Sequence, residues 1–218
     1  MRYGVGWALA LSVAMMGCGR EAPVPAAQAA TSAPAVAVTS ARPGEAARPP
    51  AHMDSAVPRA VALERFRQGS PRVTELEGGA GSRDELVHRF ARAVAVRDTA
   101  ALRRLLLSRA EFAWLYYPTS KQGLPPYDLS PDLMWFMTAE RSQRGAAALM
   151  SERAGQALRL VGYRCLGDST VEGANRLWGP CVIRRVQAPG DTVEERLFGP
   201  VIERGGRFKF VSYSNRLD

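Results

Sequence analysis

A run of 41 residues, 20–60, limits which part of this chain can fold. It contains 14 Ala and 7 Pro, and it has no aromatic residue, Leu or Ile. Such a composition cannot form a hydrophobic core, and the prolines interrupt any continuous helix and favour extended polyproline II structure. We therefore expect an unstructured tether over 18–60 and a single globular domain over 61–218.

The segment before the tether has the properties of an export signal. Arg2 precedes an apolar stretch, residues 5–16. At about 1.5 Å per residue, a helix of this length spans roughly 18 Å, which is too short for a bilayer core of about 30 Å. We therefore expect a signal peptide over 1–17 rather than a transmembrane helix.

The end of this segment, residues 15–18 (MMGC), resembles the lipobox of bacterial lipoproteins. The resemblance implies that Cys18 is acylated and becomes the mature N-terminus, so that the membrane is bound through a lipid anchor. Gly19 stands where an inner-membrane retention signal has Asp, which implies an outer-membrane protein that faces the periplasm. The alternative is a secreted protein, cleaved at an A-x-A site such as 27–29.

Charge and cysteine content restrict the function further. The chain has 29 basic and 21 acidic residues, a formal net charge of +8, but the charges are scattered and form no block of five. This pattern indicates a mildly basic surface and no nucleic-acid partner.

With Cys18 acylated, two cysteines remain in an oxidising compartment, where a pair is usually bridged.

The spacing of Cys165 and Cys181 supports this bridge. Each lies eight residues from Gly173, the expected centre of a turn. In a symmetric antiparallel hairpin the two therefore face each other, with Cα atoms about 4.5–5.5 Å apart, within the range of about 4.4–6.8 Å that disulfides adopt. We expect a structural Cys165–Cys181 disulfide.

Helix start signals recur in the first half of the domain. Ser82 and Glu85 form a capping-box pattern, Asp98 is a suitable N-cap for a second helix, and Ser130 precedes Pro131 at the start of a third. We expect Gly145 to divide this third helix. Other segments are expected to form a short helix (61–68), a short strand (72–76) and a buried strand or helix end (110–117).

The final third changes to strand patterns. Turn residues separate four expected strands, 158–166, 176–188, 193–204 and 207–213, which predicts an antiparallel meander and an α+β fold.

This order of elements is similar to that of the nuclear transport factor 2-like superfamily, which includes ketosteroid isomerase and SnoaL-like polyketide cyclases. The resemblance covers about 82–215 and is carried by residues 84–87 with Phe90, by 97–102 and by 205–210. It implies helices packed on a curved antiparallel sheet, which together form a cone with a pocket. These motifs are structural, so they imply a fold and no activity.

No catalytic constellation emerges from the sequence. The domain has one histidine, His88, and no known hydrolase, phosphate-loop or metal motif. Isomerase chemistry needs a carboxylate base near acidic donors. Glu111 or Asp128 could be the base, and the donor candidates are Tyr116, Tyr117, Tyr127 and Tyr163. No position matches a catalytic motif, so we assign no catalytic residue, no metal ligand and no cofactor.

An aromatic group is the best pocket candidate, because ligand pockets are mostly apolar with a few polar groups. The proposed lining residues are Trp114, Tyr116, Tyr117 and Trp135, and the alternative is that this group is core. We expect a non-catalytic envelope lipoprotein that binds a small apolar ligand or an envelope protein. The alternatives are a cavity enzyme of the isomerase or cyclase type and a structural factor that forms a homodimer through its sheet.

Overall fold

The computed structural model describes residues 57–187, 190–214 and 217. The predicted signal peptide, Cys18 and the tether up to residue 56 lie outside the described residues. The described part is α+β, as expected, and it belongs to one unit, Met53–Asp218. Its α-helices are α1 (Arg59–Arg67), α2 (Arg83–Ala95), α3 (Thr99–Leu105), α4 (Arg109–Glu111) and α5 (Pro131–Glu152).

The expected helix starts are present, because their caps are local. The Ser82 hydroxyl accepts a hydrogen bond from the Glu85 backbone N–H (3.0 Å), and Asp98 accepts one from Ala101 (2.7 Å). The Glu85 carboxylate reaches Gly81 N–H rather than Ser82, so the capping box is only half formed there. Ser130 caps α5 through the N–H of Leu133 (3.3 Å).

Two local expectations were wrong, and a third is confirmed in one of its two alternatives. Residues 72–76 form an irregular loop instead of a strand. Residues 110–117, expected as a strand or a helix end, are helical: α4 continues through a π-helical turn, Phe112–Tyr116. Gly145 does not divide α5, which is continuous over 22 residues. Its missing side chain instead permits a close approach, since a Cβ atom there would lie 2.8 Å from the Cβ of Tyr213.

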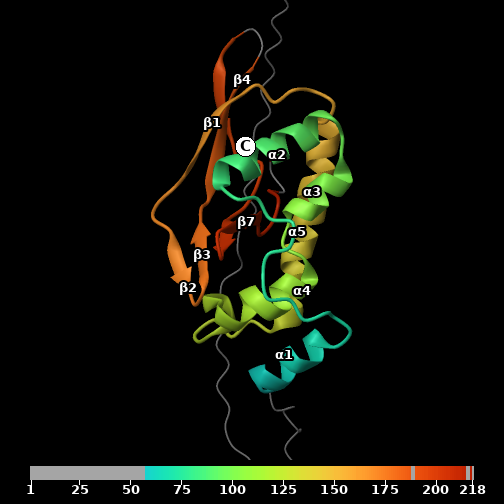
Figure 1. Ribbon diagram of the computed structural model, residues 1–218, viewed down its shortest axis with the longest axis vertical. Coiled ribbons are helices and arrows are strands. Elements are labelled where there is room, and N and C mark those ends of the chain that lie inside the picture. Colours follow the sequence, from blue (N-terminus) through green and yellow to red (C-terminus); the bar gives the residue numbers. More distant parts are fainter. Residues whose placement is uncertain (1–56, 188–189, 215–216, 218) are drawn as a thin grey trace, which may run out of the picture. The chain divides into compact units, whose positions relative to one another are not determined.

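In the part of the chain that the structure describes, seven strands form two antiparallel sheets rather than one meander (Figure 1). One sheet has the order β1-β4-β5 and the other β2-β3-β6-β7. The strands are β1 (Leu160–Cys165), β2 (Thr170–Glu172), β3 (Asn175–Trp178), β4 (Cys181–Val186), β5 (Thr192–Glu195), β6 (Val201–Arg204) and β7 (Arg207–Phe210). The expected long strands 176–188 and 193–204 are therefore each split in two.

The break between β3 and β4 allows one hairpin to contribute strands to both sheets. Near its tip, β2 pairs with β3, and near its base, β1 pairs with β4. Gly179 and Pro180 interrupt the strand between β3 and β4. Pro has no N–H to donate, so a ladder cannot continue through Pro180.

The hairpin brings Cys165 opposite Cys181, and the structure joins them by a disulfide. The route differs from the expected symmetric turn. Glu172 pairs with Asn175, so the turn is centred between Gly173 and Ala174. If the strand pairing continued from this turn without a bulge, Cys165 would lie opposite Val182. The β1–β2 side has four residues (166–169) where the other side has three (178–180), and this one-residue bulge restores the cysteine pairing.

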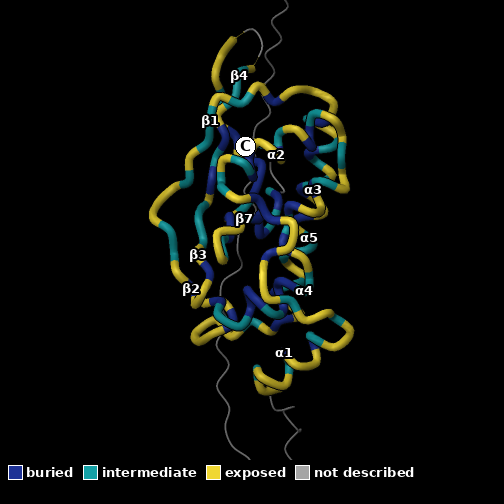
Figure 2. Tube along the Cα trace, viewed as in Figure 1, coloured by how far each residue is buried: buried dark blue, intermediate teal, exposed yellow. Residues whose placement is uncertain are grey.

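Two core clusters lie on opposite faces of β6. Val201 belongs to the first cluster, with Phe90, Phe198 and Phe210, and its neighbour Ile202 belongs to the second, with Phe112. Successive side chains of a strand point to opposite faces, so β6 is covered on both sides. Figure 2 shows the buried residues running through the middle of the domain, between the strands and α5.

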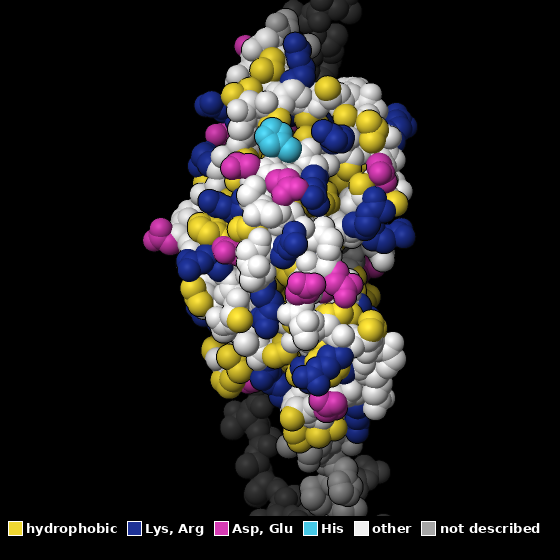
Figure 3. All heavy atoms as spheres, in the orientation of Figure 1, with side chains coloured by type: hydrophobic (Ala, Val, Ile, Leu, Met, Phe, Trp, Pro, Cys, Tyr) yellow, Lys and Arg dark blue, Asp and Glu magenta, His cyan; other side chains and the backbone are white. Residues whose placement is uncertain are grey.

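The surface is charged, with both signs interspersed. Figure 3 shows basic and acidic side chains mixed across the face in view. On the sheets, Arg164 pairs with Glu194 (2.6 Å) and Arg176 with Glu203 (3.8 Å). Exposed pairs of this kind contribute little to stability, about 0–1 kcal/mol each.

Candidate functional site

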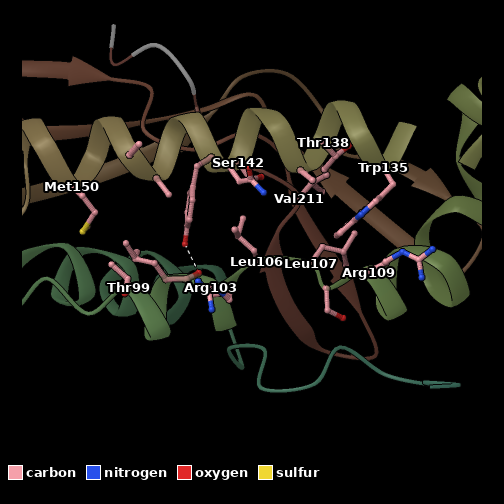
Figure 4. Close-up of a pocket in the computed structure, with 17 residues that line it drawn as sticks. Thr99, Arg103, Leu106, Leu107, Arg109, Trp135, Thr138, Ser142, Met150 and Val211 are labelled. Atoms are coloured by element: carbon pink, nitrogen blue, oxygen red, sulfur yellow. Dashed lines mark hydrogen bonds between the residues drawn. The ribbon is translucent and has the colours of Figure 1, made fainter. Parts of the chain in front are cut away.

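A cavity of about 630 Å³ lies between α3 and α5 (Figure 4). The segment after β7 contributes Val211 and Tyr213 to it, and Ser108 and Arg109 come from the start of α4. Its volume falls within the range of about 300–1,000 Å³ that is usual for small-molecule sites. The other lining residues are Thr99, Leu102, Arg103, Leu106, Leu107, Trp135, Thr138, Ala139, Ser142, Gln143, Ala146, Ala147 and Met150.

The cavity exists because α5 presents small side chains there. The lining positions from Trp135 to Met150 recur at helical spacing, so they form one face of α5. Between its larger ends this face carries Ala139, Ser142 and Ala146, which leave the space toward α3 unfilled. At about 1.5 Å per residue the face extends roughly 22 Å.

The position of the cavity follows from the two core clusters. Met134, near the start of α5, is buried in the second cluster, and Leu149, near its end, is buried in the first. The small residues lie between these two anchors. The cavity is therefore at the junction of the clusters, bridged by a helix that is fixed at both ends.

The opposite wall is apolar and well anchored. Leu102 of α3 and Leu106, the residue that follows α3, line it, and Leu107 N–H donates to Phe210 C=O (2.9 Å). The Tyr213 hydroxyl donates to Leu102 C=O (2.7 Å). Burial raises the pKa of Tyr213, so its hydroxyl stays neutral. The leucines and Tyr213 of this wall therefore add no ionised group to the cavity.

Two arginines supply the only charges among the lining residues. Arg109 is already held, since its Nη1 donates to Ser70 Oγ (2.7 Å) and its guanidinium lies 4.1 Å from the Phe66 ring centre. The Arg103 side chain is exposed and has no hydrogen bond or ion pair to another described residue. The cavity thus combines apolar walls with a cation, Arg103, that has no side-chain partner within the described part of the chain.

Of the four predicted pocket residues, only Trp135 lines this cavity. Tyr117 is fully buried and donates to Leu129 C=O (2.9 Å), and burial raises the pKa of Tyr116 to about 12. Trp114 is covered by the guanidinium of Arg67, 4.0 Å from its ring. These three residues do not line the cavity: Tyr116 and Tyr117 belong to the second core cluster and Trp114 packs against it, which agrees with the alternative that the group is core.

The carboxylates considered as bases do not face the cavity. Glu111 is buried and accepts hydrogen bonds from Lys209 Nζ (2.9 Å), Glu77 N–H and Ser108 N–H. Asp128 is in a turn with a φ of 44°. Glu111 is therefore a structural residue, and no Asp or Glu is among the lining residues of the cavity.

One buried carboxylate was missed by the sequence reasoning. Glu172 is 9% exposed, and its Oε2 has no hydrogen-bond partner among the described residues. Burial raises its pKa, and its charge in turn helps to raise the pKa of Tyr116. Glu172 does not line the cavity, and it lies in a three-residue strand whose pattern gave no signal of a special role.

A second, smaller hollow of about 270 Å³ includes His88. Asp84 and Tyr163 also line it, and burial raises the pKa of Tyr163, with a further increase from Asp84. His88 itself is exposed. The hollow therefore has polar groups but no enclosed reaction site around the histidine.

No family model, curated protein or solved structure matches the chain. Within the described ranges, no three His, Cys, Asp or Glu side chains are grouped so as to hold a metal ion. No helix in those ranges is both long and apolar enough to cross a membrane.

Proposed function

We propose that this protein is a non-catalytic lipoprotein of the bacterial cell envelope whose globular head binds an apolar ligand between α3 and α5. The observation that carries the binding proposal is the cavity itself, which has apolar walls along roughly 22 Å of α5 and no carboxylate. The lipid anchor at Cys18 and the periplasmic, outer-membrane location rest on the lipobox-like residues 15–18.

The nuclear transport factor 2-like cone is part of this proposal. Its support is the order of α2, α3 and α5 followed by antiparallel strands, with the helices packed on them. In such a cone the ligand is enclosed by helices and sheet. The structure differs at β6 from a sheet that is covered on one face only. Val201 and Ile202 belong to different core clusters, so both faces of β6 are buried.

The two alternative functions have less support. An isomerase or cyclase would need a carboxylate in the cavity beside a tyrosine, whereas Tyr213 has only Leu102 C=O as its partner and no lining residue is acidic. A homodimer formed through the sheet would need an apolar outer face. Each sheet instead carries an exposed ion pair, Arg164 with Glu194 on one and Arg176 with Glu203 on the other.

Ligand binding is tested with N-phenyl-1-naphthylamine, a neutral apolar dye. The full chain with Cys18→Ser, purified without detergent, is titrated and the dye fluorescence is followed. We expect saturable binding that Ala146→Phe abolishes, because the larger side chain fills the cavity. Ala148→Phe is the matched control, since Ala148 is on α5 but does not line the cavity. Absence of saturable binding, or equal binding by Ala146→Phe, would contradict the proposal.

The anchor is tested by mass spectrometry of the mature N-terminus. We expect an acylated Cys18 in the native chain, and loss of membrane attachment in Cys18→Ser. An unmodified N-terminus near Ala30 would contradict the lipoprotein assignment and favour secretion.

A further inference from the structure

We infer that the ligand of the α3–α5 cavity is a long-chain fatty acid, whose carboxylate binds Arg103 and whose acyl chain lies along α5. This inference rests on the proposed function and names the chemical class of its ligand.

The shape of the cavity favours a single long chain. The lining face of α5 is long and continuous, from Trp135 to Met150, and its central residues are small. A lining that extends along about four turns of one helix suits an extended chain better than a compact ring system. The facing wall supplies methyl groups from Leu102, Leu106 and Val211, which favour an aliphatic chain through the burial of apolar surface.

The charged side chains of the cavity lining favour a ligand with an anionic group that binds at Arg103. Arg103 and Arg109 line the cavity without any acidic neighbour in the lining, so an anionic group is attracted and a cationic one is repelled. Arg109 is occupied by Ser70 and by the Phe66 ring. Arg103 has no partner among the described side chains, and Figure 4 shows it on α3, across from the α5 face.

A single guanidinium matches a carboxylate in particular. Two parallel N–H groups of Arg donate to the two oxygens of a carboxylate, which fixes the orientation of the head group. The lining also includes hydroxyl and amide side chains, among them Thr138, Ser142 and Gln143, which can donate hydrogen bonds. A carboxylate therefore uses the donors that the cavity presents.

The experiment compares oleate with oleyl alcohol, which has the same chain and no charge. Each displaces N-phenyl-1-naphthylamine from the full Cys18→Ser chain, below the concentration at which the lipid forms micelles. We expect oleate to displace the dye at a roughly fivefold lower concentration, because an ion pair of a partly exposed Arg is worth about 1 kcal/mol. Raising the salt concentration should reduce this preference.

Arg103→Gln should abolish the preference and leave displacement by oleyl alcohol unchanged. Arg104→Gln is the control, since it removes the same charge from the next residue of α3, which is exposed and does not line the cavity. Equal displacement by the two lipids, or a preference that survives in Arg103→Gln, would overturn the inference. Tighter displacement by a single-chain phospholipid than by oleate would overturn the fatty-acid assignment. If the dye itself does not bind, the proposed function fails instead.

Discussion

The Nζ atom of Lys209 lies 2.9 Å from both carboxylate oxygens of Glu111, and both side chains are almost completely buried. This pair connects β7 to the start of the π-helical turn, across 98 residues of sequence. Lys209→Met would leave the Glu111 charge without its cation, so we expect a loss of about 3–5 kcal/mol in the free energy of unfolding. Urea denaturation measures it.

A double variant separates the charge from the packing. In Lys209→Met with Glu111→Gln no charge remains at this pair, and the single amide oxygen can still accept from one of the two backbone N–H groups, of Glu77 or of Ser108, that bind the two carboxylate oxygens. We expect the double variant to be more stable than Lys209→Met alone. A double variant that is less stable than either single variant would show that the ion pair is not the main reason for the loss.

The Cys165–Cys181 bridge closes the β1–β4 ladder, with a sequence separation of 16. For a loop of this length, the chain-entropy model gives about 3 kcal/mol of stabilisation. We expect Cys165→Ala with Cys181→Ala to lose roughly that amount. Thiol labelling of the unfolded, unreduced Cys18→Ser chain should detect no free cysteine, and two reactive thiols would contradict the bridge.

The hydrogen bonds of Glu195 predict that the free energy of unfolding decreases in acid. It accepts hydrogen bonds from Arg185 (2.7 Å) and Arg153 (2.9 Å). The bonds from Arg185 hold the pKa of Glu195 below its usual value, and Arg153 adds to this against the opposing effect of burial. Because folding lowers this pKa, the stabilisation is complete above the unfolded-state value of about 4.3 and is lost as the pH falls through the folded-state value.

Glu195→Gln measures that contribution. We expect the variant to lose about 2 kcal/mol at pH 7, because hydrogen bonds between charged partners are replaced by weaker ones. The difference from the parent chain should shrink as the pH falls from about 5 to 3. Denaturation curves at several pH values check this, and a difference that is constant over that range would contradict it.

We expect Gly145→Ala to destabilise the protein, which is the reverse of the usual effect of this substitution in a helix. Gly→Ala inside a helix usually stabilises by about 1 kcal/mol. Here the new Cβ would contact the backbone of Ser214 and lie 2.8 Å from the Tyr213 Cβ, so we expect destabilisation of about 1–3 kcal/mol. Gly162→Ala, with nothing within 4 Å of its added Cβ, should change stability little. A gain in stability for Gly145→Ala would contradict the close packing of α5 on this segment.

The helices were predictable because their signals are local. Ser82, Asp98 and Ser130 each cap a helix through an N–H three residues further along the chain, so a short window of sequence contains the whole interaction. The strand content was also accessible from turn residues, and the cysteine pairing from the number of cysteines that remain in an oxidising compartment, whereas the spacing argument did not foresee the bulge that restores the pairing. The α+β class follows from these two signals together.

The rest depends on contacts between distant residues. The aromatic segment 110–117 has strand-like composition, but it is helical because Glu111 is fixed by Lys209 and the aromatics pack around Ile202. The alternation on β6 does not reveal that both of its faces are covered. The cavity was missed because its signal is small side chains at helical spacing on α5, which sequence patterns do not distinguish from an ordinary helix face.

The most direct measurement of the central claim is to identify what the protein carries when it is purified from its own envelope under native conditions. Organic extraction and mass spectrometry of the full chain should recover a long-chain apolar compound, close to one per protein, that is absent from the Ala146→Phe variant and retained by Ala148→Phe. Recovery of no such compound from the parent chain, or of equal amounts from Ala146→Phe, would contradict ligand binding between α3 and α5.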